Sequence, residues 1–173
     1  VKEKPDKVAE IFTLAGFEVE QIIPLGQELE QGIVGQVQAI DKHPDADKLT
    51  VCSVDIGTSR KLSIVCGAQN IKPGHKVPVA RVGTTLPNGL NIEQRKIRGV
   101  ASEGMLCAED ELDLGHDHSG IMILPAEARL GQPLPRALKL NDTLLDISIS
   151  PNRPDGFSVL GLAREYAALT GRK

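Results

Sequence analysis

The stretch from Ile33 to Asn70, IVGQVQAIDKHPDADKLTVCSVDIGTSRKLSIVCGAQN, decides the fold of this chain. It contains three runs rich in β-branched residues, which are separated by the polar loop 43–48 and the tight turn 57–60. Such runs between turn residues are typical of short β-strands. Strand, polar loop, strand, turn and strand predict the beginning of a small closed β-barrel. The predicted strands are Ile33–Asp41, Leu49–Ile56 and Lys61–Val65.

Short strands continue after this stretch, again with glycine and proline between them. Because proline has no backbone N–H, Pro78 predicts that its strand lies at the edge of a sheet or contains a bulge. We expect residues 32–140 to form a five-stranded OB-type β-barrel with extra strands. The further elements expected here are strands at Lys76–Val82, Ile92–Ile97 and Gly104–Cys107 and a helical turn at Glu109–Asp113.

Both ends of the chain combine a helical pattern with a strand pattern. Apolar residues three and four positions apart predict an amphipathic helix, and alternation of apolar and polar residues predicts a strand. The polar segment Gln27–Gln31 is expected to be a linker. The elements expected at the ends are the helix Pro5–Ala15, the strand Phe17–Ile23, the strand Thr143–Ile149 and the helix Phe157–Thr170.

The aromatic residues divide the chain into two parts. There are four, Phe12, Phe17, Phe157 and Tyr166, and none lies between residues 18 and 156. We expect the two ends to pack together around these rings while the middle folds around its own core. The sequence thus predicts an α+β protein, in which the barrel is inserted into a small discontinuous α/β domain made from both chain ends. The predicted limits are 1–31 and 141–173 for that domain and 32–140 for the barrel.

Composition limits the function classes. The 173 residues carry a net charge of −3, which argues against a uniformly basic nucleic-acid-binding surface. No apolar run approaches the roughly 20 residues that a membrane helix needs, and Val1–Lys7 do not show the basic-then-apolar pattern expected at the start of a secretory signal. Three cysteines without CxxC spacing, Cys52, Cys66 and Cys107, indicate buried thiols in a reducing cytoplasm. Because the chain begins with Val1, we expect it to be a piece of a longer protein.

Two acidic loops suggest metal binding. Asp41, Asp45 and Asp47 surround His43, but the glycine and the distal glutamate of an EF-hand loop are missing. His116 and His118 flank Asp117 without an evident third ligand. Solvated loops are the favoured interpretation of both, and no metal site is predicted.

The chain has no nucleophile–base motif and no glycine-rich phosphate loop, so we expect it to be catalytically inactive by itself. Its densest basic segment is Gln94–Gly99, which is compatible equally with phosphate contacts and with a solvated strand face. Base stacking on aromatic side chains, worth roughly 1–3 kcal/mol per base, is unavailable in the middle of the chain. Any RNA bound there is therefore expected to be held by its backbone.

Three segments, Ile33–Lys48, Ile64–Asn70 and Lys96–Cys107 (KIRGVASEGMLC), resemble the tRNA-binding OB module of the bacterial phenylalanyl-tRNA synthetase beta subunit. Similar modules occur on some methionyl-tRNA synthetases and in free-standing tRNA-binding cofactors. The flanks favour the N-terminal part of the beta subunit, because they follow its order. They include Leu14–Val19 before the barrel, and Asp117–Ile121, Asp146–Ile149 and Pro151–Asp155 (PNRPD) after it.

This resemblance implies a role in joining phenylalanine to its tRNA. The whole enzyme would be a cytoplasmic alpha2beta2 assembly that uses ATP and magnesium, with its synthetic site in the alpha subunit and its editing site in a later beta domain. This fragment would need no cofactor of its own. The implied partners are phenylalanine-specific tRNA, the alpha subunit and the remaining beta domains, with neither a membrane nor DNA among them. The alternative is an assembly module that touches no RNA.

The resemblance also suggests RNA-binding positions. The barrel side with the segment SEGM faces tRNA in stand-alone modules, which points to Ser102, Glu103 and Met105. A structural role for these three, in which they form a turn and Met105 plugs the barrel, is the competing hypothesis. The expected phosphate contacts are Lys48, Asn70, Lys72, Arg81, Lys96 and Arg98.

Overall fold

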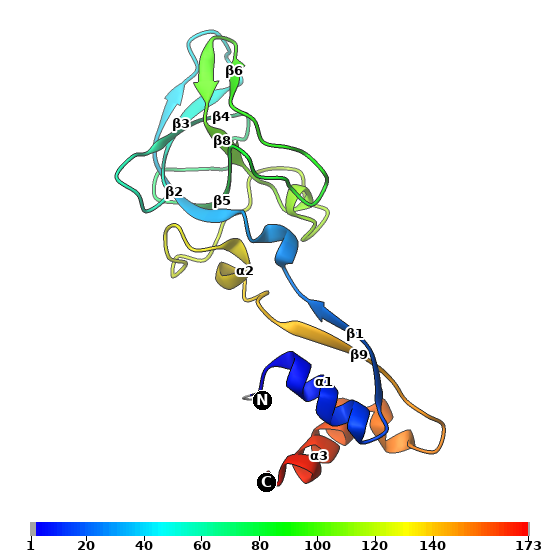
Figure 1. The fold of residues 1–173 in the computed structure, drawn as a ribbon. Coiled ribbons are helices and arrows are strands. Elements are labelled where there is room, and N and C mark those ends of the chain that lie inside the picture. The colour runs from blue at the N-terminus through cyan, green and yellow to red at the C-terminus, as the bar shows by residue number, and fades with distance from the viewer. Residues whose placement is uncertain (1–2, 173) are drawn as a thin grey trace. The chain divides into compact units, whose positions relative to one another are not determined.

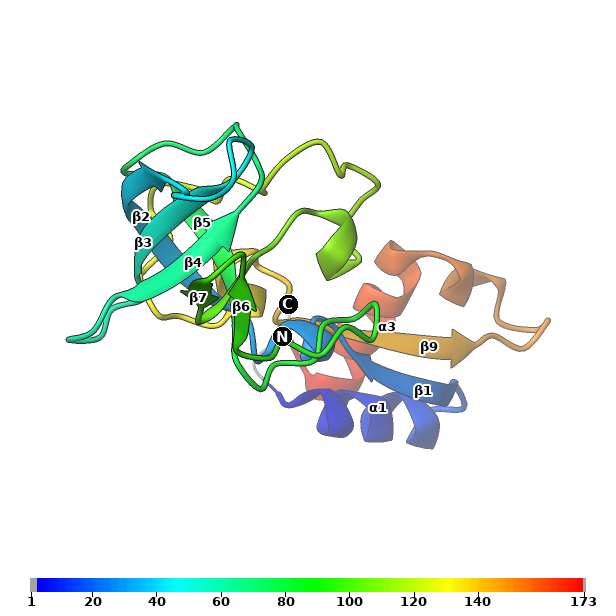
Figure 2. The same ribbon diagram turned by 90° about the horizontal axis from the view of Figure 1, so that it is seen from above.

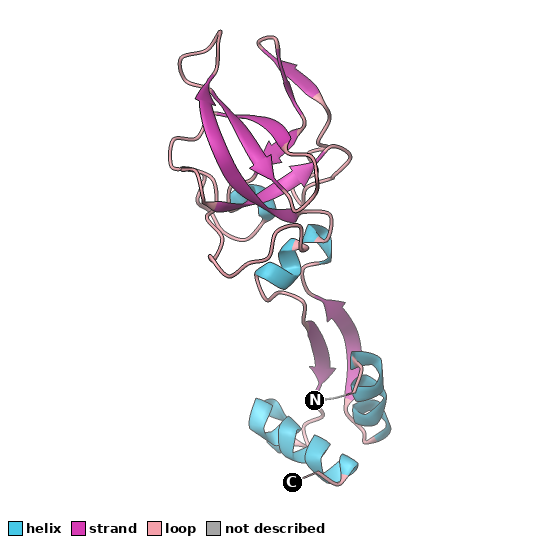
Figure 3. Ribbon diagram, turned by 90° about the vertical axis from the view of Figure 1, so that its left-hand side faces the viewer, coloured by secondary structure: helices cyan, strands magenta, loops and turns pink. Residues whose placement is uncertain are grey.

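The computed structural model of the chain describes residues 3–172 and has an α+β fold, as the sequence predicts. Its contacts divide the chain into two units. One unit extends from Gly26 to Asn141, and the other combines the segment ending at Leu25 with the segment beginning at Asp142. Figure 3 shows that strands dominate the first unit, whose helical pieces are short. The domain limits 1–31, 32–140 and 141–173 stay a prediction.

Five antiparallel strands form the barrel of the first unit (Figure 1). Their order in the sheet is β4-β3-β2-β5-β8. The sheet nearly closes on itself, because the backbone N–H of Glu103, just before β8, donates to the carbonyl of Ser63 in β4 at 2.8 Å. The strands are β2 (Ile33–Lys42), β3 (Thr50–Asp55), β4 (Leu62–Cys66), β5 (Lys76–Arg81) and β8 (Gly104–Leu106).

Both faces of this sheet are covered. Alternation directs Val77 and Val79 of β5 into the barrel and Ala80 to the outside, where a second cluster packs on it. The interior cluster includes Val37, Cys52, Val54, Ile64 and Leu106, and the outer cluster includes Leu29, Leu86, Ile92, Cys107, Leu112 and Leu134. The sequence patterns did not indicate this outer cluster. It buries Leu29, which lies in a 3-10 turn (η1, Gln27–Leu29) where a polar linker was expected.

Pro78 lies neither on an edge strand nor in a bulge, and that prediction is wrong, because β5 pairs in continuous register with β2 on one side and with β8 on the other. The carbonyl of Pro78 accepts the N–H of Cys107 at 3.2 Å, so its nitrogen faces the same neighbour. Pro78 has no N–H to donate to the carbonyl of Cys107. That carbonyl accepts instead from the N–H of Met122 at 3.1 Å. The β5–β8 ladder thus ends at Val79 and Leu106, beside the proline.

The barrel unit also contains short elements outside the five-stranded sheet. Strands β6 (Arg95–Ile97) and β7 (Val100–Ser102) form a separate two-stranded ribbon, which turns at Arg98 and Gly99. Both turn residues have positive φ, 44° at Arg98 and 89° at Gly99. The helical turn η2 (Asp110–Leu112) confirms the one expected near residues 109–113, and α2 (Leu134–Ala137) lies near the end of the unit.

The second unit packs two helices on one face of a two-stranded antiparallel sheet (Figure 2). Burial alternates along β9, so Leu145 and Ile147 face the helices while their neighbours are exposed. Ser158 caps the second helix by accepting the N–H of Gly161 at 3.0 Å. The elements are α1 (Pro5–Leu14), β1 (Glu18–Pro24), β9 (Thr143–Ser148), the 3-10 turn η3 (Pro154–Phe157) and α3 (Val159–Thr170).

Three of the four aromatic rings form the core of this unit. The ring of Phe12 lies 6.0 Å from that of Phe17 and 5.9 Å from that of Tyr166, measured between centroids. Phe157, which was expected to join them, is 71% exposed. The guanidinium of Arg153 lies 4.5 Å from the centroid of Phe17 and forms ion pairs with Asp155 and Glu165. The PNRPD segment thus closes over the core through its arginine.

No helix among the described residues is long and apolar enough to cross a membrane.

Candidate nucleic-acid interface

Two hydrogen bonds attach the loop 43–48 to the β6–β7 ribbon. Nε2 of His43, which is 5% exposed, donates to the carbonyl of Ile97 at 3.0 Å, while its Nδ1 accepts the N–H of Asp45 at 3.1 Å. Nη1 of Arg98 then donates to the carbonyl of Asp45 at 3.3 Å. Two segments about 50 residues apart in sequence are thereby held at one end of the barrel (Figure 1).

This end of the barrel carries three of the predicted phosphate contacts. Lys48 in the loop and Lys96 and Arg98 in the ribbon are all exposed. The same loop exposes Asp45 and Asp47, whose carboxylates reduce the local positive potential. Mixed charge of this kind makes a contact surface for phosphates that is weaker than a purely basic patch.

Alternation along β6 divides the basic segment between two faces. Arg95 and Ile97 line a cavity in the barrel wall, and Lys96, between them, points the other way. We therefore interpret the segment 94–99 as two features, a solvated basic edge and one wall of a cavity. Side-chain alternation along a strand predicts this division, but only once the residues that form the strand are known.

The remaining predicted cations lie in other parts of the unit. Lys72 is exposed in the turn between β4 and β5, and Arg81 is exposed at the end of β5. Lys76, the first residue of β5, is engaged within the fold. Its ammonium group donates to the carbonyls of Ala126 and Ala128, the latter at 2.6 Å.

Ser102 and Glu103 make contacts that hold the barrel closed. The Ser102 hydroxyl is buried, accepts the N–H of Val65 at 3.1 Å and donates to the carbonyl of Gly104 at 2.9 Å. The carboxylate of Glu103 accepts the N–H of Ser63 at 3.1 Å and forms an ion pair with Arg60. These contacts support the structural interpretation of the SEGM segment, and an RNA-binding role for the two residues stays a prediction.

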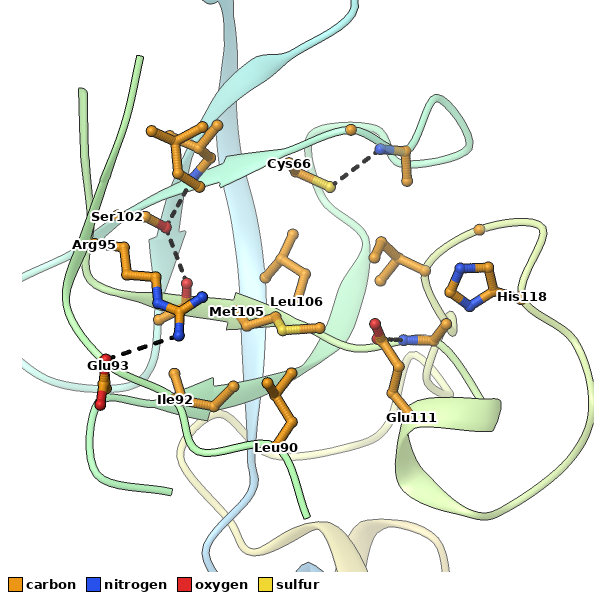
Figure 4. A pocket seen from close by; sticks show the side chains of 18 of the residues that line it. Cys66, Leu90, Ile92, Glu93, Arg95, Ser102, Met105, Leu106, Glu111 and His118 are labelled. Atoms are coloured by element: carbon orange, nitrogen blue, oxygen red, sulfur yellow. Dashed lines mark hydrogen bonds and ion pairs between the residues drawn. The ribbon is translucent and has the colours of Figure 1, made fainter. Parts of the chain in front are cut away.

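Met105 is half-buried and lies on the floor of a cavity of about 510 Å³ (Figure 4). Leu106 continues this apolar floor, while Arg95 and Glu111 bring charge to the rim. Ile121 is a further apolar residue of the lining. One oxygen of Glu111 accepts the N–H of Ala108 at 2.7 Å. The sequence pattern placed His43 only in a solvated acidic loop, because its contact with Ile97 lies 54 residues away. It gave no sign that Glu111 lines a cavity.

Neither acidic loop forms a metal centre among the residues that the structure describes. Nδ1 of His118 hydrogen-bonds to a carboxylate oxygen of Asp110 at 2.7 Å. Hydrogen bonds from Ser119 lower the pKa of Asp117, whose carboxylate accepts the N–H of that residue at 2.8 Å. The loop is thus ordered by its own turn contacts.

Comparisons with known proteins agree with the resemblance seen in the sequence. Residues 33–133 match the family described as putative tRNA binding domain. The phenylalanine–tRNA ligase beta subunit of Burkholderia pseudomallei (strain 1710b) is 50% identical over 172 residues, which cover 96% of this chain and 21% of that subunit. The corresponding subunit of Salinibacter ruber is 47% identical over 180 residues, 95% of this chain and 22% of that protein.

Among solved structures, a MetRS related protein from Pyrococcus horikoshii aligns with 27% identity and a TM-score of 0.44, over 60% of this chain and 88% of that one. The predicted resemblance to the phenylalanyl-tRNA synthetase beta subunit is confirmed by the sequence identities. The chain spans about a fifth of the length of the curated relatives that it matches.

Proposed function

This chain belongs to the putative tRNA-binding domain family, and on that basis we propose that its barrel unit binds the sugar–phosphate backbone of tRNA without catalysing a reaction. The observation that carries this proposal is the family match over the barrel, residues 33–133. The exposed cations at the end organised by His43 supply the chemistry, because phosphate contacts need charge and position rather than aromatic platforms.

The relatives suggest the larger setting. We propose that the chain is a non-catalytic part of a cytoplasmic phenylalanine–tRNA ligase, as in proteins about 50% identical to it. Its partners would then be phenylalanine-specific tRNA, the alpha subunit and the other beta domains in an alpha2beta2 assembly. ATP and magnesium would serve the synthetic site of that enzyme, outside this chain.

A second candidate function is assembly without RNA contact. Asp45 and Asp47 beside the basic ribbon, the net charge of −3 and the lack of aromatic residues in the barrel favour it. Under this hypothesis the barrel packs on other domains of the enzyme. A footprint of tRNA on the whole ligase distinguishes the two, because only the first predicts protection that depends on this barrel.

The direct test measures tRNA binding by fluorescence anisotropy across a range of salt concentrations. The Lys96→Ala/Arg98→Ala double variant should bind more weakly, and its plot of log K against log salt should be shallower by about two, one for each lost phosphate contact. The matched control is Arg129→Ala/Arg136→Ala, which removes the same charge from exposed positions elsewhere on the unit.

Three outcomes of this measurement test the phosphate contacts. An unchanged slope in the control, with a reduced slope in the first variant, supports phosphate contacts at the ribbon. If the plot of log K against log salt becomes shallower by the same amount in both double variants, only net charge matters, and the proposed interface is wrong. Binding that does not depend on salt would remove the phosphate contacts altogether.

A further inference from the structure

The cavity beside the β6–β7 ribbon combines an apolar floor with a few charged side chains. Its volume of about 510 Å³ lies within the roughly 300–1,000 Å³ of small-molecule sites, which are also mostly apolar with a few polar groups. Met105 and Leu106 form the floor, and Leu90 and Ile92 add apolar side chains from the loop before β6 (Figure 4). The shape and the lining thus fit a small, flat, mostly apolar group.

One polar side chain of the lining has hydrogen-bonding capacity that the fold does not use. Glu111 is held in place because one of its carboxylate oxygens accepts the N–H of Ala108 at 2.7 Å. Its other oxygen has no hydrogen-bond partner within residues 3–172, and the side chain lines the cavity. The carboxylate can therefore accept a hydrogen bond from a group that lies on the floor beside it.

The other charges of the lining favour a neutral group inside the cavity and a phosphate at its mouth. Figure 4 shows Arg95 and Glu111 on opposite sides of the floor. Arg95 and Glu93 are both largely exposed, and their ion pair of 3.7 Å is loose enough for the guanidinium to turn toward an anion. His118 is engaged by Asp110 at 2.7 Å. Because Glu111 repels an anion beside it, a phosphate is expected on the Arg95 side.

We propose that this cavity binds the base of one unpaired RNA nucleotide that carries an exocyclic amino group. The face of the base lies on Met105 and Leu106, since sulfur makes favourable contacts with aromatic rings. The amino group donates to the unpaired oxygen of Glu111, as carboxylates accept from the amino group of cytosine in other complexes. Arg95 contacts the phosphate of the same nucleotide. This site rests on the proposed function and extends it from phosphate contacts to the binding of a base.

The ribbon relates the base site to the proposed phosphate contacts. Side chains alternate along β6, so Arg95 and Ile97 line the cavity while Lys96 points away from it. One short strand thus presents a solvated cation on one face and a cavity wall on the other. Unpaired nucleotides offer both their face and their Watson–Crick edge to a protein, which paired ones do not. Met105 takes the role that aromatic platforms have in other RNA-binding proteins.

The test is nuclear magnetic resonance of the folded 173-residue protein with isotopically labelled methionine methyl groups. The chain has two methionines, and Met122 is not among the described residues that line the cavity, so it serves as an internal control for Met105. No Phe, Tyr or Trp lies between residues 18 and 156, so the ring current of a bound base should dominate any shift of the Met105 methyl.

Two nucleotides that differ at the amino group are the probes. Cytidine monophosphate should shift the Met105 methyl and bind about tenfold more tightly than uridine monophosphate. In uracil a carbonyl replaces the amino group, and the ring N–H lies between two carbonyls that the carboxylate of Glu111 repels. Arg95→Ala should weaken the binding of cytidine monophosphate but not that of cytidine, which has no phosphate.

A matched pair of variants tests the role of Glu111. Glu111→Gln keeps an acceptor for the N–H of Ala108 but presents an amide N–H to the ligand, so the preference for cytidine monophosphate should be lost. Glu127→Gln removes the same charge from an exposed position outside the cavity lining and should leave the preference unchanged. If Glu111→Gln does not fold, the comparison of the two nucleotides in the unsubstituted protein still decides the matter.

Equal affinities for the two nucleotides, or shifts at Met122 as large as those at Met105, would overturn the proposal. A titration with tRNA separates it from the proposed function. If tRNA binds with the expected salt dependence but leaves the Met105 methyl unchanged, base binding is refuted and the phosphate contacts stand. If tRNA does not bind at all, the proposed function fails as well. A Met105 shift on tRNA binding that Glu111→Gln abolishes, while the salt dependence stays the same, supports the base site.

Discussion

The side chain of Asn70 exchanges two hydrogen bonds with the backbone of Ile121. Its Nδ2 donates to the carbonyl at 2.8 Å, and its Oδ1 accepts the N–H at 3.0 Å. The side-chain amide thereby satisfies both backbone groups of a residue 51 positions away, as a neighbouring strand would. A Cβ on Gly120 would come within 2.5 Å of the same side chain, so the approach is close. Asn70 thus positions one side of the cavity that Ile121 lines.

This exchange predicts that Asn70 stabilises the barrel whether or not it contacts RNA. Asn70→Ala should lower the free energy of unfolding by about 1–3 kcal/mol, because it leaves two partly buried backbone groups of Ile121 unpaired. Urea titration followed by circular dichroism measures the change. Asn141→Ala, at an exposed position, serves as the control and should change stability little. Equal stability of the two variants would contradict the assignment.

The second prediction concerns the contact between His43 and Ile97. His43→Ala should destabilise the barrel unit by about 1–3 kcal/mol, since a buried side chain that bonds to two backbone groups is lost. It should also increase amide exchange in the β6–β7 ribbon, which hydrogen-exchange mass spectrometry detects. His116→Ala, which removes an exposed histidine, should leave that exchange unchanged. If both variants behave alike, His43 does not hold the ribbon.

Alternation in the sequence predicted the positions of the main strands, because side-chain alternation is a local property that each strand displays by itself. Leu145, Ile147 and Ile149 on one face of the β9 segment, for example, pack on the helices as expected. Pro78 was placed wrongly because its missing N–H affects only one neighbour. That neighbour, β8, ends before the proline is reached. The sequence shows that Pro78 lacks a backbone N–H, but it does not show which neighbouring strand lies on that side of the proline.

Contacts between distant residues account for most of what the sequence could not show. For Ser102 the sequence left open an RNA-facing position and a structural turn, and it did not show that the hydroxyl bonds to Val65 and Gly104. His43 looked like part of a solvated loop, but it is buried against Ile97. Small polar residues give no local sign of burial, because their hydrogen-bond partners become apparent only in the folded chain.

The third prediction concerns Gly161 in α3. A Cβ at this position would lie 1.7 Å from the carbonyl oxygen of Asp155, so the 3-10 turn η3 can approach the helix only beside glycine. Gly161→Ala should therefore destabilise the unit, although alanine is favoured over glycine by about 1 kcal/mol within a helix. Thermal unfolding measures the sign. The reverse change at an exposed site of the same helix, Ala168→Gly, should cost about 1 kcal/mol through helix propensity alone. A more stable Gly161→Ala protein would refute the steric argument.

The last prediction concerns pH. The hydrogen bond from Tyr166 is the main reason that the pKa of Glu3 falls from 4.5 to about 2, and Arg172 contributes to the shift. Because the folded-state pKa is lowered, the ionised carboxylate stabilises the fold fully above pH 4.5, and this contribution disappears as pH falls toward 2. Stability of the unit built from both chain ends should decrease through that window.

Tyr166, the single tyrosine of a chain without tryptophan, reports unfolding by its own fluorescence. Glu3→Gln should flatten the pH dependence, whereas Glu10→Gln, on an exposed pair with Lys7, should leave it nearly unchanged. A slope that persists in Glu3→Gln would assign the acid sensitivity to other carboxylates.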